Sequence, residues 1–325
     1  MGAPSVDVIL IVAEHLDVQS VLRLRETNKA ICQAIDGYRH SISKGRLKEF
    51  TVPPTGDALS SELFARRLLP HGSLEMVREI EIRECRIHDI LTASAFVNFA
   101  CPLGMGPLTT SQQANLYGLL KKALYQCNVI ADIAVNSQCR PIPESSYGRI
   151  NSGHFKDALL APMLREQDPV THPLVRPYQR EYINQLSLED VAVLFYLTKL
   201  FSLGYVQYYQ GYVPQRFDAF EDCVLQHGTW FLWCFAASKP LWKVMGESIV
   251  DIGMVGLRNY RDDEGNTVPS LKRALVDRFK HLANCGTNAV GKIRLVVQHL
   301  VQETDGYKNG EWQGEIDVGT GDEEI

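Results

Sequence analysis

Three short segments contain residues of the types that carry chemistry in proteins. Residues 151–154 (Asn-Ser-Gly-His) put a hydroxyl near an imidazole, 262–265 (Asp-Asp-Glu-Gly) resemble part of a calcium loop, and 104–107 (Gly-Met-Gly-Pro) resemble part of a phosphate-binding loop. None is complete. Catalytic Ser and His residues are brought together by the fold and not by adjacency in sequence. The acidic segment lacks the bidentate Glu of a calcium loop, and Pro107 removes a backbone N–H group. We therefore predict no catalytic residue, no metal site and no cofactor.

The histidines and cysteines are dispersed along the chain. No two of the nine histidines lie three or four residues apart, and the eight cysteines form no C-x-x-C pair. Cysteines scattered singly among apolar residues are typical of reduced, buried thiols in an intracellular protein. The apolar start of the chain follows no basic segment, which argues against a signal peptide. We expect a cytoplasmic or nuclear protein that does not bind a membrane.

Negative charge is concentrated at the C-terminal end. Residues 303–325 contain eight acidic residues and one lysine, a net charge of −7, whereas the whole chain carries −5. Residues 1–302 therefore sum to +2, which gives no electrostatic basis for binding nucleic acid. The acidic segment is predicted to be a flexible, solvated tail.

Residues 4–38 (PSVDVILIVAEHLDVQSVLRLRETNKAICQAIDGY) predict three short helices. In a helix over residues 6–16, the apolar side chains fill an arc of roughly 200°, wider than the stripe of about 100° that a surface helix needs. Asp17 and Thr27 are placed to cap the next two helices. Three helices of this length bury too little apolar surface to be stable alone. The remaining apolar surface must therefore contact the rest of the chain or another protein.

This stretch resembles the F-box, the three-helix module by which substrate receptors bind the Skp adaptor of cullin–RING ubiquitin ligases. The resemblance lies in residues 6–10 (VDVIL), 16–17 (LD), 21–25 (VLRLR) and 27–31 (TNKAI). They match the acidic-then-aliphatic first helix, the Leu-Asp and leucine pattern of the middle and the Asn-Lys pair of the third helix. The sequence departs from the family at Ser5, where a proline usually stands.

The resemblance implies a non-catalytic subunit. Such a chain binds a Skp-type adaptor, and through it a cullin, and presents an unknown protein substrate for ubiquitination. The adaptor contacts that the resemblance implies are Pro4, Val8, Ile9, Val12, Leu16, Val21, Leu22, Asn28 and Lys29. Three alternatives remain open: a helical enzyme whose site is assembled from distant residues, an F-box-like protein that acts outside a ligase, and a plain helical domain of which these are the first helices.

The rest of the sequence predicts a mainly α fold with minor β structure. We expect an F-box at 1–45, a linker with two prolines at 46–58, a helical or α+β substrate-recognition domain at 59–302 and the acidic tail at 303–325. Residues 136–177 are predicted to be a long irregular connection. Helices are predicted at 60–69, 88–100, 113–127, 155–166, 187–201, 217–237, 270–282 and 289–302, and strands at 77–85 and 129–135. The alternation of strand and helix resembles the leucine-rich repeats that often follow an F-box, in degenerate form.

Aromatic residues are dense between positions 205 and 242. Exposed Tyr and Trp are enriched at the centres of protein interfaces. The candidates for substrate binding are Tyr208, Tyr209, Tyr212, Trp230 and Trp233. The alternative is that these side chains form a large aromatic core.

Overall fold

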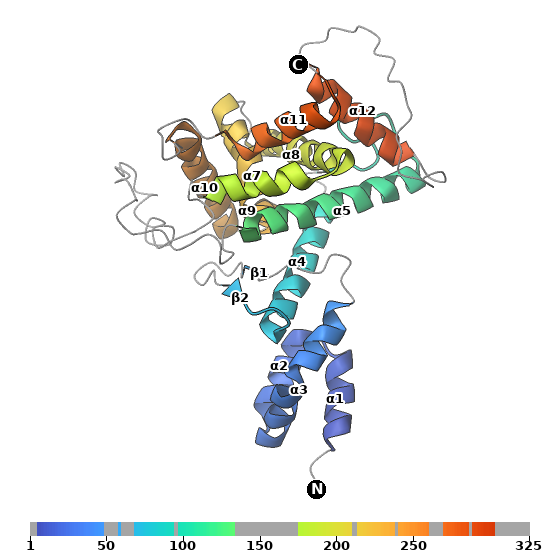
Figure 1. The fold of residues 1–325 in the computed structure, drawn as a ribbon, viewed down its shortest axis with the longest axis vertical. Helices are drawn as coiled ribbons and strands as arrows, with labels where there is room; N and C mark the ends of the chain where they lie inside the picture. The colour runs from blue at the N-terminus through green and yellow to red at the C-terminus, as the bar shows by residue number, and fades with distance from the viewer. Residues whose placement is uncertain are drawn as a thin grey trace.

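The fold is mainly α, as the sequence predicts. A computed structural model describes residues 5–48, 58–59, 68–93, 97–133, 175–209, 213–237, 240–259, 269–285 and 288–302. A module of three helices lies at one end of the molecule, and a larger helical body lies at the other end (Figure 1). The two are joined through one helix, α4.

The N-terminal module consists of α1 (Val6–His15), α2 (Val18–Thr27) and α3 (Lys29–Leu47). Each helix begins at a polar cap, because side-chain oxygens of Ser5, Asp17 and Asn28 accept hydrogen bonds from backbone N–H groups of the first turn. The cap of the third helix is therefore Asn28, one residue after the predicted Thr27. The core of the module contains Ile9, Ala13, Val18, Val21, Ala34, Ile35 and Ile42.

Two exposed aspartates of the module, Asp17 and Asp36, are expected to make the stability of the module fall as the pH falls in the acid range. Hydrogen bonds from Ser20 lower the pKa of Asp17, and a hydrogen bond from Arg25 lowers the pKa of Asp36. Because both values lie below the unfolded value of 3.8, the stabilisation is present above that pH and is lost as the pH falls through the folded pKa. Circular dichroism measures the melting temperature of the wild type and of Asp17→Asn/Asp36→Asn at pH 5 and at pH 3. We expect the fall between these two pH values to be about 1–2 °C smaller in the variant than in the wild type. Parallel curves would contradict this.

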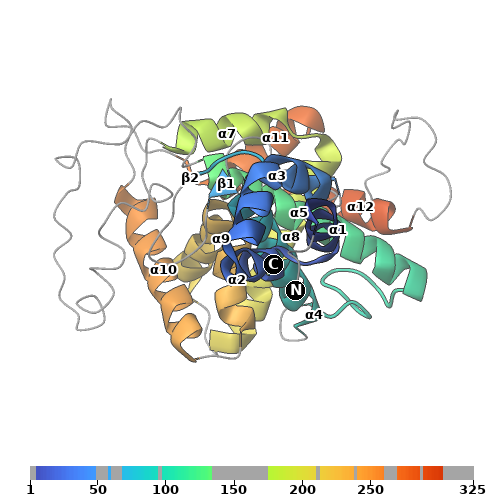
Figure 2. The same cartoon turned by 90° about the horizontal axis from the view of Figure 1, so that it is seen from below.

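Helix α4 (Leu74–Thr92) belongs to both parts of the molecule. Its first turns place Leu74 and Val77 in the core of the module. Its last turns place Ile90 and Leu91 in the core of the body. Figure 2, seen from below, shows α1–α3 in front of the helices of the body. The module is thus attached by continuous helix and not by a loop.

Polar contacts fix α4 on both sides. Toward the module, the carboxylate of Glu81 accepts the Val18 N–H (3.2 Å) and pairs with Arg46 (3.3 Å). Toward the body, Arg83 pairs with Asp132 (2.6 Å) of α5 (Thr110–Ile133), and within α4 it pairs with Glu79 (3.0 Å). The surrounding carboxylates raise the pKa of Arg83 although its burial lowers it, so the guanidinium stays charged. Arg46 was assigned to a linker that starts at residue 46, but α3 continues through Leu47 and Arg46 is part of the module.

The predicted strand at 77–85 is wrong, since these residues form the middle of α4. The nine residues alternate, but over 74–92 the buried positions Leu74, Val77, Ile87 and Leu91 follow helical spacing. Ser73 caps the helix by accepting the Met76 N–H (3.1 Å). The predicted strand at 129–135 is also wrong, because α5 (Thr110–Ile133) continues through these residues as far as Ile133.

Without these strands the leucine-rich-repeat interpretation is wrong for the described residues. Their β structure is one antiparallel pair, β1 (Ala58–Leu59) and β2 (Leu68–Leu69). Leu68 and Leu69 were predicted to end a helix, and residues 60–67 of that helix lie outside the described residues. The helix predicted at 88–100 ends at Thr92, and residues 97–108 form a loop.

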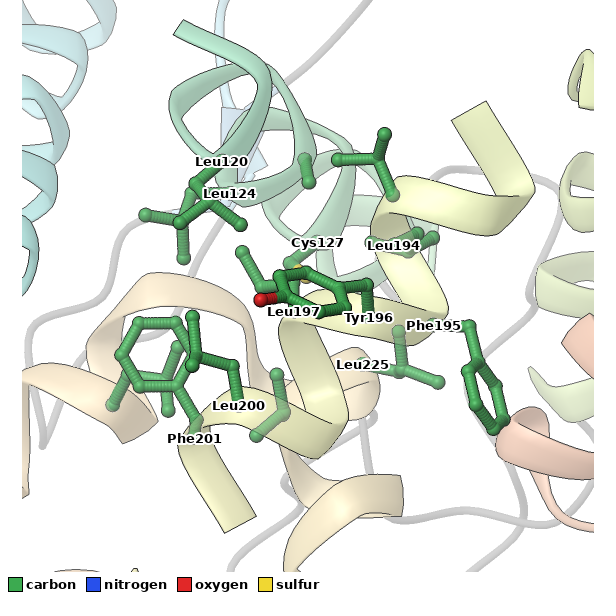
Figure 3. Close-up of a cluster of buried hydrophobic side chains, with 14 of the residues drawn as sticks. Leu120, Leu124, Cys127, Leu194, Phe195, Tyr196, Leu197, Leu200, Phe201 and Leu225 are labelled. Atoms are coloured by element: carbon green, nitrogen blue, oxygen red, sulfur yellow. The ribbon is translucent and has the colours of Figure 1, made fainter. Parts of the chain in front are cut away.

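The body is built from helices that pack around α5, α8 and α9. Their bounds are α7 (Arg176–Gln185), α8 (Leu188–Tyr209), α9 (Pro214–Ala236), α10 (Pro240–Asn259), α11 (Leu271–Leu282) and α12 (Ala289–Gln302). Figure 3 shows Leu124 and Cys127 of α5, Leu197 and Phe201 of α8, and Leu225 of α9 converging in the core. The helices predicted at 187–201, 217–237, 270–282 and 289–302 are confirmed. Helix α7 was not predicted, and the helix predicted at 155–166 lies outside the described residues.

Candidate partner-binding surface on the first helix

Helix α1 has one face in the core of the module and one face in solvent. Ile9 and Ala13 are buried against the neighbouring helices, and Leu10 and Leu16 are half-buried. The opposite face is also apolar. On it the exposed fractions are 52% for Val8, 58% for Ile11 and 42% for Val12.

These exposed side chains form a continuous stripe. Val8, Ile11, Val12 and His15 lie at i, i+3, i+4 and i+7, which places them on one side of a helix. Val6, 45% exposed, lies at the N-terminal end of the same helix. Large aliphatic side chains grouped on one exposed face indicate a surface for a partner. The helix packs on α3, and the stripe stays open to solvent.

The structure divides the predicted adaptor contacts into three groups. Val8 and Val12 are exposed, and Leu16 and Leu22 are half-buried, so all four are accessible to a partner. Asn28 and Lys29 are exposed at the start of α3, where the Asn28 Oδ1 accepts the Ala30 N–H (2.7 Å) as a helix cap. Pro4 lies outside the described residues.

Two of the predicted contacts are wrong. Ile9 is 6% exposed and Val21 is fully buried, so both stabilise the module from inside and cannot contact a partner. Conversely, the prediction omitted Ile11, the most exposed aliphatic residue of the stripe. Ile11 lies three residues after Val8 and four before His15, and this helical spacing could have placed it on the same face.

The aromatic residues proposed for substrate binding are mostly structural where the structure describes them. Trp230 is 6% exposed and lies in the core, so its assignment to a binding surface is wrong. Trp233 is half-buried: its Nε1 donates to Asp89 (2.9 Å) and its ring contacts Trp242 edge to face (5.2 Å). Tyr208 and Tyr209 lie in α8, but their side chains, like Tyr212, are outside the described residues. Of the two tryptophans, whose side chains the structure describes, Trp233 is the one that reaches the surface.

Helix α10 also carries exposed aliphatic side chains. Leu241 of α10 is 67% exposed and Val244 is 43% exposed. The guanidinium of Arg86 lies over the Trp233 ring at 5.8 Å. Arg86 of α4, Trp233 of α9 and Trp242 of α10 therefore lie together at one part of the surface of the body.

The described residues show no arrangement that indicates catalysis. In them, no group of three His, Cys, Asp or Glu side chains could hold a metal ion. The cysteines among these residues are free thiols, and burial raises the pKa of Cys127 and Cys223. Cys85 and Cys101 are exposed, so the prediction that the cysteines are buried is wrong for these two. Gly104 forms a turn with φ +67°, and residues 151–154 and 262–265 lie outside the described part.

Comparisons of the chain with models of protein families, with curated proteins and with solved structures found no match. Among the described helices, none has both the length and the apolar content that are needed to cross a membrane.

Proposed function

We propose that this chain is an F-box-type substrate receptor that binds a Skp-type adaptor through α1 and presents a protein target for ubiquitination. The observation that carries the proposal is the exposed apolar stripe of Val8, Ile11 and Val12 on a capped three-helix module. The sequence resemblance over the same residues supports it. In this proposal the catalytic groups lie on other subunits of the ligase, and the contribution of the chain is to bring the target close to them.

The size of the stripe is adequate for a central part of an interface. Burying a large aliphatic side chain contributes about 1.5–3 kcal/mol before the costs of association. Val8, Ile11 and Val12 together therefore supply several kcal/mol, and the half-buried Leu16 and Leu22 add to this. Asn28 and Lys29, which are exposed, are proposed as polar contacts at the edge of the interface.

The continuous helix α4 supports a role in positioning a target. The module and the body share α4, so a partner on α1 and a target on the body are held in a fixed relative orientation. The half-buried Trp233, with its neighbours Arg86 and Trp242, is the part of the body that we propose for the target. An intracellular location, in the cytoplasm or nucleus, is part of this proposal.

The test is co-expression with a Skp-type adaptor followed by gel filtration. The wild-type chain is expected to elute with the adaptor. Val8→Asp/Val12→Asp places two charges on the apolar stripe, and we expect it to lower the affinity for the adaptor at least about 100-fold. Both positions are exposed, so the variant retains its fold. Ile9→Asp is unsuitable, because Ile9 is buried and the change would unfold the module.

The matched control is Gln33→Asp/Ser41→Asp. Both residues are exposed on α3, and neither belongs to the α1 stripe. We expect this variant to elute with the adaptor as the wild type does. A wild-type chain that remains monomeric beside excess adaptor, or loss of binding in both variants, would contradict the proposal.

A role outside a ligase is distinguished by adding the cullin. A receptor in a ligase forms a ternary complex of chain, adaptor and cullin. A chain that binds the adaptor but is displaced by the cullin acts outside a ligase.

A further inference from the structure

The last two helices of the body are strongly basic. Residues 269–302 contain six Lys or Arg residues and one acidic residue, Asp277, and α12 itself contains no acidic residue. The 23 residues that follow carry a net charge of −7. The two opposite charges thus meet at Gln302, where α12 ends.

Part of this positive charge has no ionic partner in the described structure. Lys272 pairs with Asp218 and Glu221, and Arg273 pairs with Asp277. In contrast, no ion pair with another described residue is formed by Lys280 of α11, or by Lys292 and Arg294 of α12. These three cations are available to an acidic ligand.

The outer face of α12 combines charge with apolar surface. Arg294 and Leu295 are exposed, Leu295 by 42%, and Val290 in the first turn is 57% exposed. The loop at residues 97–108 continues this face, because the Gln298 Nε2 donates to the Gly104 carbonyl (2.7 Å) and Leu103 is 40% exposed. We use the name α12 face for Val290, Lys292, Arg294 and Leu295 of α12, Leu103 of the loop, and Lys280 of the neighbouring helix α11.

The position of Arg294 is partly fixed by its neighbours. A Cβ added at Gly104 would lie 2.7 Å from the Arg294 Cδ, so the aliphatic part of Arg294 packs on the backbone of this loop. A side chain whose stem is already packed loses less conformational entropy when its guanidinium binds a carboxylate.

We propose that the acidic segment 303–325 of this same chain folds back and binds the α12 face. Charge complementarity favours this occupant, since −7 lies next to three cations without ionic partners. The segment also carries Tyr307, Trp312 and Ile316, which are suited to Val290, Leu295 and Leu103. The proposal is independent of the adaptor surface, because α12 and α1 lie at opposite ends of the molecule (Figure 1).

The length of the segment permits this contact. Twenty-three residues span up to ~75 Å when extended, whereas the 14 residues of α12 are about 21 Å long. A segment that begins at Glu303 therefore reaches every cation of the α12 face. Because both groups are in one chain, the effective concentration of the segment is high, on the order of millimolar.

Limited proteolysis of the full chain tests the proposal. Lys308 is the only Lys or Arg after Gln302, so trypsin releases residues 309–325 as one fragment that mass spectrometry identifies. We expect Lys292→Glu/Arg294→Glu to speed this cleavage at least about threefold, because the segment is no longer held. Arg39→Glu/Lys44→Glu, two exposed positions on α3, is the control and is expected to cleave at the wild-type rate.

Carbodiimide cross-linking of the wild-type chain gives a second measurement that needs no variant. We expect links between Lys280 or Lys292 and carboxylates of 303–325, and none to Lys44. In a mixture of unlabelled and ¹⁵N-labelled chains, these links are expected within one isotope. Links that join the two isotopes would assign the contact to a second copy and overturn the proposal. Equal cleavage rates in all variants together with no such links would also overturn it.

Discussion

Gly228→Ala is expected to lower the free energy of unfolding of the helical body by about 3–5 kcal/mol. Gly228 lies inside α9 with φ 64° and ψ −152°, where the helix is interrupted. This region of backbone conformation is accessible essentially to glycine alone. Any side chain at this position therefore strains the backbone before its contacts are considered.

The contacts of an added Cβ increase this cost. It would lie 2.7 Å from the Asn128 Oδ1 and 3.3 Å from the Cys127 carbonyl of α5. The Asn128 Oδ1 accepts hydrogen bonds from the Thr229 N–H (2.9 Å) and hydroxyl (2.8 Å). To relieve the overlap, α5 and α9 must separate or the Asn128 side chain must abandon both hydrogen bonds, which are buried.

Urea unfolding followed by tryptophan fluorescence measures this effect, because Trp230, Trp233 and Trp242 all lie in α9 and α10. The matched control is Gly118→Ala in α5, where an added Cβ meets no atom within 4 Å. It is expected to raise stability by about 0.5–1 kcal/mol. A Gly228→Ala protein that unfolds at the wild-type urea concentration would show that the interruption in α9 is not required.

Helices with their own caps were predictable from sequence. Ser270 precedes an amphipathic segment, and its Oγ accepts the Arg273 N–H (3.1 Å). Ser187 does the same for the Asp190 N–H (3.1 Å) at the start of α8. In these segments the cap and the apolar period are both local, so neighbouring residues contain all the information.

The strand predicted at 77–85 failed because its window was shorter than the element. Over nine residues an alternating pattern and a helical pattern share several positions. The buried side chains of α4 face two different cores, so its apolar residues do not form one clean stripe. The Glu79–Arg83 pair at i and i+4 is a helical signal that the alternation concealed.

The surface of α1 shows the same division between local and tertiary information. The wide arc of apolar side chains on α1 was predictable from the sequence. That width indicated that one apolar face would not be covered within the module. Which face that is depends on where α3 packs, and the sequence does not contain that angle. Ile9 was therefore assigned to the partner, and Ile11, on the open face, was missed.

Arg176 is the clearest case of a residue that sequence patterns could not place. It falls within the segment 136–177 that was predicted to be irregular, yet it opens α7 and is 1% exposed. Its Nη2 pairs with the Asp222 carboxylate of α9, which is 2% exposed. The Asp222 Oδ1 also accepts the Leu271 N–H (2.6 Å), so this pair joins α7, α9 and α11.

Arg176→Met is therefore expected to lower the free energy of unfolding of the body by about 3–5 kcal/mol, although methionine fills much of the same volume. The loss arises because Asp222 keeps its charge in the core, where among the described residues the Leu271 N–H is the one hydrogen-bond donor that remains to it. Urea unfolding measures it against Arg273→Met, whose pair with Asp277 has side chains 65% and 45% exposed. That control is expected to stay within about 0.5 kcal/mol of the wild type. Equal losses in the two variants would contradict this prediction, because the buried Arg176–Asp222 pair would then contribute no more to stability than the exposed Arg273–Asp277 pair.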